Sequence, residues 1–339
     1  LSSNKNIKII IYNQVNILIP WNGLGRMHDK YVIADDSLYI LGGRNTFGYF
    51  LGDYAGHKNY DRDVLVYNTG SKASSIYQIK DYYKKITSQK CCSVFHCNES
   101  LGEKNSVKKA EQELKNRYES LENKYDKFLA ENYDYKANTY ETNKINLLSN
   151  PTSLYTKQPT VYYGLMYLAK NAKKEVKIHT PYIICNDYMY KELKNIKVPT
   201  TIMTNSAENN GNIFGAVDYL NHKKDIINTG VTIKEYEGGI SYHGKSMTID
   251  DDIAIVGSFN MDMRSAYIDT ELMLVINSKD INKQLKASME EYEKKAATVK
   301  NETEYSHIPE GMKMKELSDK KKNIKAWFGW AMNGLRFLF

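Results

Sequence analysis

Two short stretches of this chain carry a histidine, a lysine and an aspartate at the same spacing, H-x-K-x4-D. The motif residues are His28, Lys30 and Asp35 in the first copy and His243, Lys245 and Asp250 in the second. One neutral imidazole can attack phosphorus while the second supplies the proton that the leaving alkoxide needs, and ammonium groups can neutralise the phosphate oxygens. The doubled motif therefore predicts one catalytic site that acts on a phosphodiester. This site is expected to need no metal and no other cofactor.

A glycine turn and an asparagine follow each motif at one fixed distance. The first copy continues to Gly42-Gly43-Arg44-Asn45 and the second to Gly257-Ser258-Phe259-Asn260, with every matched position offset by 215 residues (28 to 243, 45 to 260). A pattern that recurs at a constant offset indicates an internal repeat. We expect the side chains of Asn45, Ser258 and Asn260 to act as neutral donors that bind the phosphate.

Each catalytic histidine needs a partner that fixes its tautomer and stabilises the imidazolium. Glu271, at the start of a strand-like run after the second motif, is the candidate partner of His243. Asp63 stands at the start of the corresponding run after the first motif and is the candidate partner of His28. We therefore expect one histidine-orienting carboxylate within each copy.

Both motifs are predicted to lie on the same local structure. In each copy two β-prone runs enclose adjacent aspartates, which is typical of a tight hairpin, and a further strand-like run follows. These runs are Tyr31–Ala34, Ser37–Leu41 and Asp63–Tyr67 in the first copy, and Ser246–Ile249, Ile253–Val256 and Glu271–Ile276 in the second. Asp35 and Asp250 fall in the turns, so we interpret these members of the catalytic motif as mainly structural.

The second motif has more predicted structure in front of it than the first. The sequence predicts strands at Val176–His179, Thr200–Thr204 and Val231–Tyr236, and a helix at Asn212–Ile227. Only a strand-like run at Ile7–Tyr12 precedes the first motif. By symmetry, we expect the first repeat to be truncated at its N-terminus, as in a fragment of a longer protein.

Composition places the chain among globular proteins with an affinity for anions. It has 339 residues, of which 42% are hydrophobic and 26% charged, which excludes a disordered, collagenous or coiled-coil chain. The formal net charge of +7 suits lipid headgroups or nucleic acid as partners. No apolar run reaches the length of about 18 residues that a membrane span needs. The four cysteines lack the paired spacing of a metal site, so we interpret them as ordinary thiols.

The two motifs with their G-[GS]-x-N turns resemble the phospholipase D superfamily. Closer details resemble its bacterial cardiolipin synthase branch, namely the Gly42–Asn45 turn, the run from Gly257 to Ser265 and the Thr270-Glu271-Leu272 sequence. The resemblance implies an α/β phospholipase D fold of two fused repeats, each with a mixed sheet flanked by helices, and an active site at the repeat interface. The expected division is a first repeat at 1–86, a linking region with an amphipathic helix at 87–150, a second repeat at 151–305 and a C-terminal tail at 306–339.

The resemblance also implies a reaction. One histidine, which we assign as His28, attacks the phosphodiester and becomes a phosphohistidine while the other protonates the departing alcohol. The second histidine then deprotonates the acceptor, either water or the glycerol hydroxyl of another lipid. The leading hypothesis is a phosphatidyltransferase that makes cardiolipin from phosphatidylglycerol. Gly43 in the first copy, where the second has Ser258, predicts that the two sides of the site are unequal.

The C-terminal tail combines lysines with aromatic residues. Its basic run is followed by Ala326–Met332 and Leu335–Phe339, and the lysines are Lys313, Lys315, Lys320, Lys321, Lys322 and Lys325. This pattern favours a helix that lies in the interface of an anionic membrane, and the alternative is a terminal helix packed on the core. We expect an anionic phospholipid as substrate and the cell membrane as location, reached peripherally or through preceding sequence.

Three other functions remain open at this point. The same residues serve a phospholipase D hydrolase, in which water replaces the lipid acceptor. A nucleic-acid phosphodiesterase would explain the positive charge, but the sequence shows no stripe of aromatic and basic residues typical of an RNA-binding module, so we expect no nucleic-acid partner. An inactive interaction module conflicts with the presence of every catalytic residue type in both motifs.

Overall fold

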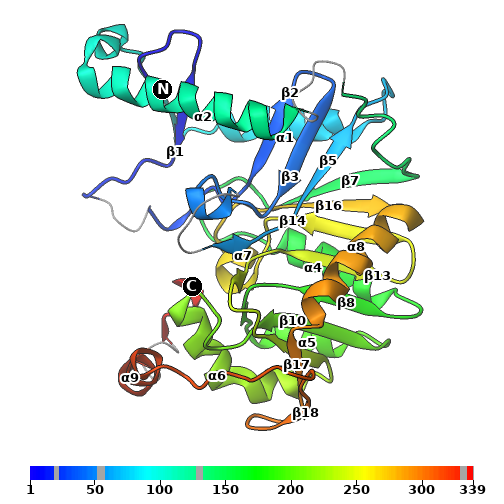
Figure 1. The fold of residues 1–339 in the computed structure, drawn as a ribbon. Coiled ribbons are helices and arrows are strands. Elements are labelled where there is room, and N and C mark those ends of the chain that lie inside the picture. Colours follow the sequence, from blue (N-terminus) through cyan, green and yellow to red (C-terminus); the bar gives the residue numbers. More distant parts are fainter. Residues whose placement is uncertain (19–22, 52–57, 127–132, 329–333, 339) are drawn as a thin grey trace.

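The computed structural model describes the chain except for residues 19–22, 52–57, 127–132, 329–333 and 339. It is a mixed α/β structure, in which one large sheet occupies the second half and a smaller sheet lies in the first half (Figure 1). The large sheet has nine strands in the order β18-β17-β11-β10-β8-β13-β14-β16-β7. The small sheet has three, in the order β2-β3-β5.

The large sheet is parallel in its middle and antiparallel toward the small sheet. β8, β10 and β11 pair in parallel through crossover helices, whereas β13, β14, β16 and β7 pair antiparallel. The strands are β7 (Lys144–Ser149), β8 (Val176–His179), β10 (Thr200–Asn205), β11 (Thr232–Tyr236), β13 (Ser246–Ile249), β14 (Ile253–Gly257), β16 (Leu272–Asn277), β17 (Ala296–Val299) and β18 (Tyr305–His307). The predicted strands before the second motif are confirmed to within one residue at each end.

The small sheet repeats the arrangement of β13, β14 and β16. Its strands are β2 (Tyr31–Ala34), β3 (Leu38–Gly42) and β5 (Asp63–Tyr67), joined in the same antiparallel order. Both predicted hairpins are present, and the turn residues Asp35 and Asp250 adopt nearly identical left-handed φ angles of 49° and 51°. Aspartate tolerates this conformation because its short side chain can bond locally.

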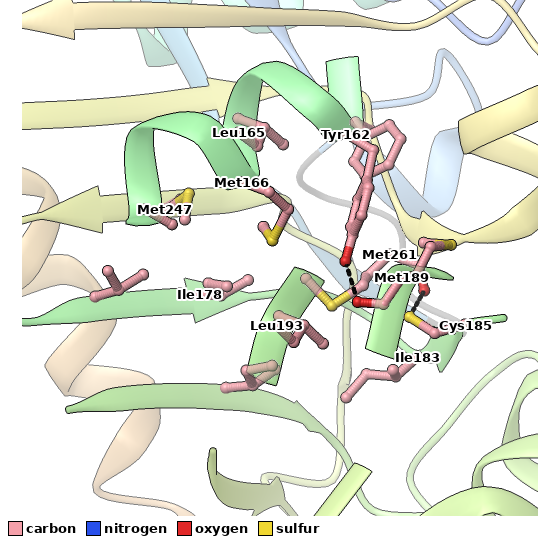
Figure 2. Close-up of a cluster of buried hydrophobic side chains, with 14 of the residues drawn as sticks. Tyr162, Leu165, Met166, Ile178, Ile183, Cys185, Met189, Leu193, Met247 and Met261 are labelled. Carbon is pink, nitrogen blue, oxygen red and sulfur yellow. Dashed lines mark hydrogen bonds between the residues drawn. The ribbon is translucent and has the colours of Figure 1, made fainter. Parts of the chain in front are cut away.

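Helices cover the large sheet, and the two larger hydrophobic clusters of the described residues lie against it. The first lies between the sheet and α4, α5 and α6, where the Tyr162 hydroxyl donates to the Met189 carbonyl over 2.6 Å (Figure 2). In the second core, Val256 and Leu274 of the large sheet pack with Tyr39 and Leu41 of β3. Both faces of β14 and β16 are therefore buried, which explains their continuous apolar sequence. The helices concerned are α1 (Ser75–Thr87), α4 (Thr160–Lys170), α5 (Asp187–Lys194), α6 (Ile213–Ile227) and α8 (Lys279–Glu293).

Short pairings and peripheral helices complete the fold. The two-stranded pairs are β1 (Ile9–Tyr12) with β6 (Cys92–Phe95), β4 (Asn59–Tyr60) with β12 (Ser241–Tyr242), and β9 (Ile183–Ile184) with β15 (Met261–Asp262). The remaining helices are α2 (Asn105–Lys124), α7 (Met263–Tyr267) and α9 (Asp319–Phe328), with 3₁₀ turns at η2 (Gly48–Phe50), η3 (Glu99–Glu103) and η5 (Arg336–Leu338). The predicted linking helix corresponds to α2, whose apolar Leu114 and Tyr118 are exposed. Within the described ranges, no helix has the length and apolarity that crossing a bilayer requires.

Candidate active site

His28 is positioned by backbone pairing with the second half of the chain. Met27 forms a parallel bridge with Thr270, whose N–H donates to the Arg26 carbonyl over 3.0 Å. The His28 N–H donates to the Thr270 hydroxyl over 3.3 Å. This pairing sets the next residue, Glu271, beside the imidazole, and His28 Nδ1 donates to Glu271 Oε1 over 2.8 Å. A carboxylate from the second half therefore holds the histidine of the first motif.

His243 is positioned by the reciprocal pairing with the first half. β12 runs parallel to β4, and the His243 N–H donates to the Tyr60 carbonyl over 2.6 Å. Asp61 follows β4 directly, and its Oδ2 accepts a hydrogen bond from His243 Nδ1 over 2.6 Å. Each imidazole thus uses Nδ1 to bind a carboxylate, which leaves Nε2 as the nitrogen available for chemistry.

The crossed pairs correct the expectation of one pair within each copy. Glu271 binds His28 instead of His243, and the acid that binds His243 is Asp61 instead of Asp63. The Asp63 carboxylate instead accepts a hydrogen bond from Arg44 Nε over 2.5 Å. Asp63 is therefore a structural residue at the start of β5 in this fold.

The register of the two sheets explains the correction. Gly42 pairs with Asp63 in the small sheet, and Gly257 pairs with Met273 in the large sheet. Two residues before these partners stand Asp61 and Glu271, which are therefore equivalent positions. Asp63 is the first residue of its strand, which is why the strand pattern indicated it. The residue equivalent to Glu271 stands two positions before the partner of the motif glycine, and that residue is Asp61.

Arg62 fixes the segment that carries Asp61. Its guanidinium donates to the Tyr242 hydroxyl over 2.9 Å, to Ser246 Oγ over 2.5 Å and to Ser288 Oγ over 3.0 Å, all in the second half of the chain. Because Asp61 precedes it directly, these bonds restrain the carboxylate that binds His243. No sequence pattern indicated this role, because Arg62 lies outside both motifs.

The two motif lysines form the cationic part of the site. Lys245 Nζ lies against the His243 imidazole, 2.6 Å from Nδ1 and 3.1 Å from Nε2, and Lys30 Nζ donates to the His28 carbonyl over 2.5 Å. Burial lowers the pKa of each lysine to about 8, and the charge of Lys30 contributes to the lowering at Lys245. The two ammonium groups therefore share one pocket, as an anion site requires.

Both histidines are neutral at physiological pH. Burial and then the charge of Lys245 lower the pKa of His243 to about 3, and the charge of His28 lowers it further. Burial, Lys30 and Lys245 hold the pKa of His28 well below its usual range. The effect of His28 on the pKa of His243, and of Lys245 on both histidines, indicates that the two imidazoles face one site. A neutral imidazole with an unprotonated Nε2 is the form that can attack phosphorus.

The two histidine-binding carboxylates differ in protonation. Burial raises the pKa of Glu271 to about 7. Burial also acts to raise the pKa of Asp61, but the charge of Lys245 and the hydrogen bond from His243 outweigh it, so this pKa lies below its ordinary value. Asp61 is therefore ionised at pH 7, whereas Glu271 titrates near that pH.

Ser258 supports Glu271 and is not placed to bind a phosphate. Its hydroxyl donates to Glu271 Oε2 over 2.5 Å and accepts the Leu272 N–H over 3.0 Å. Ser265 donates to the other oxygen of Glu271 over 2.6 Å. Because Ser258 is almost fully buried in these bonds, the expectation of a phosphate donor at this position is wrong.

Gly43 occupies the position equivalent to Ser258 for a steric reason. A Cβ atom at Gly43 would lie 2.4 Å from Asp61 Oδ1 and 2.9 Å from Lys245 Cδ. The first copy therefore needs glycine to admit the carboxylate that binds His243. The two sides of the site are therefore unequal. Glu271, which binds His28, accepts a hydrogen bond from Ser258, whereas Asp61, which binds His243, lies against Gly43, which has no side chain.

The motif asparagines differ in their environment. Asn260 is buried, and its Nδ2 donates to the Tyr182 hydroxyl over 3.1 Å. Its Oδ1 is buried without a hydrogen-bond partner among the described residues. Asn45 lies half-buried beyond the end of β3. Both remain candidates for contacts with a phosphate.

The motif aspartates lie in the turns at the far ends of the hairpins. The Asp250 carboxylate accepts the backbone N–H groups of Lys173, Lys174 and Glu175 over 2.7 to 3.2 Å. Among the described residues, neither Asp35 nor Asp250 bonds to a motif histidine. The structural interpretation of these residues agrees with this geometry, and a direct catalytic role does not.

Asp29 is a half-buried acid, with one buried carboxylate oxygen, that the motif analysis passed over. It accepts hydrogen bonds from the hydroxyls of Tyr82 over 2.5 Å and Thr270 over 2.9 Å. Burial raises its pKa to about 7. Its place inside the first motif was a signal of proximity to the site.

In the described part of the chain, no group of three or more histidine, cysteine or acidic side chains is arranged to hold a metal ion.

Comparison with known proteins identifies the family. Residues 165–292 match a family described as cardiolipin synthase, PLD-like domain. Cardiolipin synthase 1 of Staphylococcus epidermidis is 30% identical over 159 residues, which cover 46% of this chain and 32% of that protein. Residues 165–292 therefore form a domain of the phospholipase D-like superfamily.

More of the chain aligns with two other proteins. An uncharacterized protein of Helicobacter pylori is 25% identical over 332 residues, covering 86% of this chain. The chain spans 64% of the length of that relative. The crystal structure of the phosphatidylserine synthase of Haemophilus influenzae has a TM-score of 0.60 and 15% identity, covering 93% of this chain and 72% of that chain. The fold of this chain therefore resembles phospholipase D family structures over most of its length.

Proposed function

We propose that this chain is a phosphatidyltransferase that makes cardiolipin from phosphatidylglycerol through a phosphohistidine. The observation that carries the proposal is the crossed arrangement of two neutral histidines, each bound to a carboxylate of the other half, around two buried ammonium groups. We also infer that the two motif-bearing sheets are copies of one repeated unit, because they share strand order, register and turn conformation.

The asymmetry of the carboxylates supports His28 as the nucleophile. An ionised Asp61 stabilises a protonated His243 and so suits the histidine that must hold a proton. A bound phosphate anion also offsets the charge of Lys245, which holds the pKa of His243 down. Substrate binding therefore raises the proton affinity of His243, as a general acid needs.

The first half-reaction breaks the bond between phosphorus and the glycerol oxygen. His243 takes up a proton from solvent at Nε2 when the substrate binds. Nε2 of His28 then forms the new bond to phosphorus, and this proton moves from His243 Nε2 to the departing glycerol oxygen. Lys30 and Lys245 bind the non-bridging oxygens as negative charge concentrates there. Glu271 stabilises the positive charge that the phosphorylated imidazole of His28 acquires.

The second half-reaction transfers the phosphatidyl group to an acceptor. His243, now neutral, takes the proton of the acceptor hydroxyl as its oxygen attacks phosphorus, and the bond to His28 Nε2 breaks. Both histidines return to their starting state. A second phosphatidylglycerol as acceptor gives cardiolipin, and water gives phosphatidic acid.

The choice of a lipid acceptor rests on the relatives. The matching family and the Staphylococcus epidermidis relative are both described as cardiolipin synthases. The glycine-rich first turn and the basic, aromatic tail point the same way. We further propose a peripheral location at the membrane, where both lipid substrates would be present.

Lipid mass spectrometry tests the proposed function. The protein is incubated with phosphatidylglycerol vesicles beside His28→Ala and His243→Ala variants. We expect cardiolipin and glycerol from the wild type and neither product from the variants. Phosphatidic acid instead of cardiolipin would identify a hydrolase. Cleavage of nucleic acid with no change in any lipid would replace the proposal with a nuclease.

A further inference from the structure

The N-terminal end of α6 connects the active site with the protein surface. Asn212 caps this helix by accepting the Gly215 N–H over 3.1 Å. The Tyr182 ring packs closely on Gly215, where a Cβ atom would lie 3.1 Å from Tyr182 Cγ. The hydroxyl of the same tyrosine accepts the hydrogen bond from the motif residue Asn260. Phe214, between the cap and Gly215, is 42% exposed.

The tail is bound to this end of α6 through a buried lysine of α9. Lys321 Nζ donates to the carbonyls of Ala207, Glu208 and Asn210 over 2.8, 2.6 and 3.0 Å. These carbonyls belong to the loop that leads into α6. α9 contacts α6, and Figure 1 shows the two helices beside each other. The tail is therefore fixed to the core at this point.

An ion pair fixes the tail at a second point, η5. Arg336 donates to both carboxylate oxygens of Asp218, over 2.7 and 3.2 Å, and to the Cys185 carbonyl over 2.8 Å. Asp218 is buried in α6, one turn after Phe214. η5 also packs against α7, which follows the second glycine turn of the site. Both described parts of the tail are thus anchored around the same helix end.

The anchored tail presents apolar side chains to solvent within a basic surrounding. Trp327 is 76% exposed, and Leu335 and Phe337 are 46% and 44% exposed, in addition to Phe214. The lysines of α9 and the segment before it that are exposed are Lys313, Lys315, Lys320, Lys322 and Lys325. Over the same stretch the acidic residues are Glu316 and Asp319. The surface is therefore both apolar and strongly cationic.

We propose that this anchored tail surface, formed by Phe214, Trp327, Leu335, Phe337 and the five exposed lysines, docks on an anionic lipid bilayer. Aromatic side chains insert at the level of the headgroups, and lysines bind the lipid phosphates. Because α6 leads from this surface to Tyr182 and Asn260, docking sets the active site against the headgroups. The proposal rests on the proposed function in taking the substrate to be a membrane lipid.

The charge and size of the surface favour a bilayer over a second copy of this chain. Two cationic surfaces of identical sequence would repel each other on approach. Four exposed apolar side chains also bury too little area for a standard interface, which needs about 800 Å² per partner. An anionic bilayer complements the charge and accepts separate aromatic side chains.

Vesicle sedimentation tests the docking surface. Wild type is compared with a Trp327→Ala, Phe337→Ala double variant on vesicles of phosphatidylglycerol mixed with phosphatidylcholine. The matched control is a Leu114→Ala, Tyr118→Ala double variant on α2, which carries exposed apolar side chains in the other half. We expect the tail variant to lose about tenfold or more of its vesicle affinity, since each removed aromatic side chain buries apolar area in the interface. The control should bind as wild type does.

Two outcomes would overturn the docking surface. One is a tail variant that binds the vesicles as tightly as wild type. The other is equal wild-type binding to vesicles of pure phosphatidylcholine, which would exclude a role for the lysines. A shift from dimer to monomer on gel filtration of the tail variant, with vesicle binding unchanged, would identify the surface as a subunit interface instead.

A soluble substrate separates this proposal from the proposed function. Short-chain phosphatidylglycerol below its micelle concentration needs no bilayer. We expect the tail variant to keep the wild-type rate on this substrate and to lose activity on vesicles through a higher KM. If wild type transfers no phosphatidyl group but its vesicle binding depends on Trp327, the function fails and the docking surface stands. If transfer occurs and vesicle affinity is independent of Trp327, the docking surface fails alone.

Discussion

His28 Nδ1 lies 2.8 Å from Glu271 Oε1, although the two residues lie in different halves of the chain and are 243 positions apart. The reciprocal contact joins His243 to Asp61. Neither half of the chain therefore holds a complete site, because each histidine would lose the carboxylate that fixes its tautomer. Docking of the halves, through the β4–β12 pairing and the bridge from Met27 to Thr270, is what assembles the site.

The two neighbouring aspartates of the first half should differ sharply on substitution. Asp61→Asn removes the charge that stabilises protonated His243, so we expect kcat to fall roughly 100-fold or more with little change in KM. Asp63→Asn, two positions on, weakens only the contact with Arg44. Steady-state kinetics on phosphatidylglycerol checks the pair. A larger kcat loss in Asp63→Asn would contradict the crossed arrangement.

The activity should fall at alkaline pH because substrate binding becomes weaker. Lys30 and Lys245 have pKa values lowered to about 8, so they lose their charge as the pH rises through that value. We expect KM to rise above about pH 8, while the neutral histidines keep their form well below pH 6.5 because their pKa values are lowered. Lys30→Arg should move the alkaline limit upward, since arginine stays protonated. An unchanged limit in this variant would exclude Lys30 as its source.

Arg62 should act as a positioning residue. Arg62→Met removes its hydrogen bonds to Tyr242, Ser246 and Ser288 and frees the segment that holds Asp61. We expect kcat to fall on the order of 10-fold to 100-fold, as misplacement of a catalytic group by about 1 Å can produce. Arg62→Lys should recover part of the loss. If kcat stays at the wild-type value and only thermal stability falls, Arg62 is structural alone.

The position of Gly43 should tolerate no side chain. Gly43→Ala places a Cβ atom against Asp61 and Lys245, and overpacking of this kind costs about 1–3 kcal/mol in a packed core. Asp61 must shift to relieve the contact, so kcat should fall together with the melting temperature. Ser258→Gly is the matched variant on the other side of the site. It removes the serine hydroxyl that binds Glu271 and the Leu272 N–H and adds no atom. A Gly43→Ala variant with unaltered activity would show that the contact is not retained in solution.

The sequence predicted the local elements of this fold better than their long-range contacts. The hairpins around Asp35 and Asp250 follow from β-prone runs and turn residues that lie within a few positions of one another. The partner of each histidine depends instead on how the two sheets pack, which no local pattern encodes. The direction of the Ser258 hydroxyl likewise follows from the burial of Glu271 beside it.

The tail shows the same difference between local patterns, which the sequence predicts, and long-range contacts, which it does not. Its composition predicted a basic, aromatic segment. The geometry agrees with the alternative in which the tail packs on the core, and the membrane interpretation stays a prediction. Lys321 and Arg336 pack on the core through buried hydrogen bonds, whereas Trp327 is exposed. Which lysine would be buried depended on the three carbonyls before α6, and those could not be placed without the fold.

Trapping the covalent intermediate tests the central claim most directly. The enzyme is mixed with phosphatidylglycerol and quenched in alkali, which preserves phosphohistidine, and the adduct is located by peptide mass spectrometry beside a His243→Ala sample. We expect the adduct on His28 in the wild type. A leaving group that needs no proton, such as p-nitrophenol in a phosphatidyl ester, should label His28 in the variant as well. An adduct on His243, or turnover with no adduct on either histidine, would contradict the mechanism.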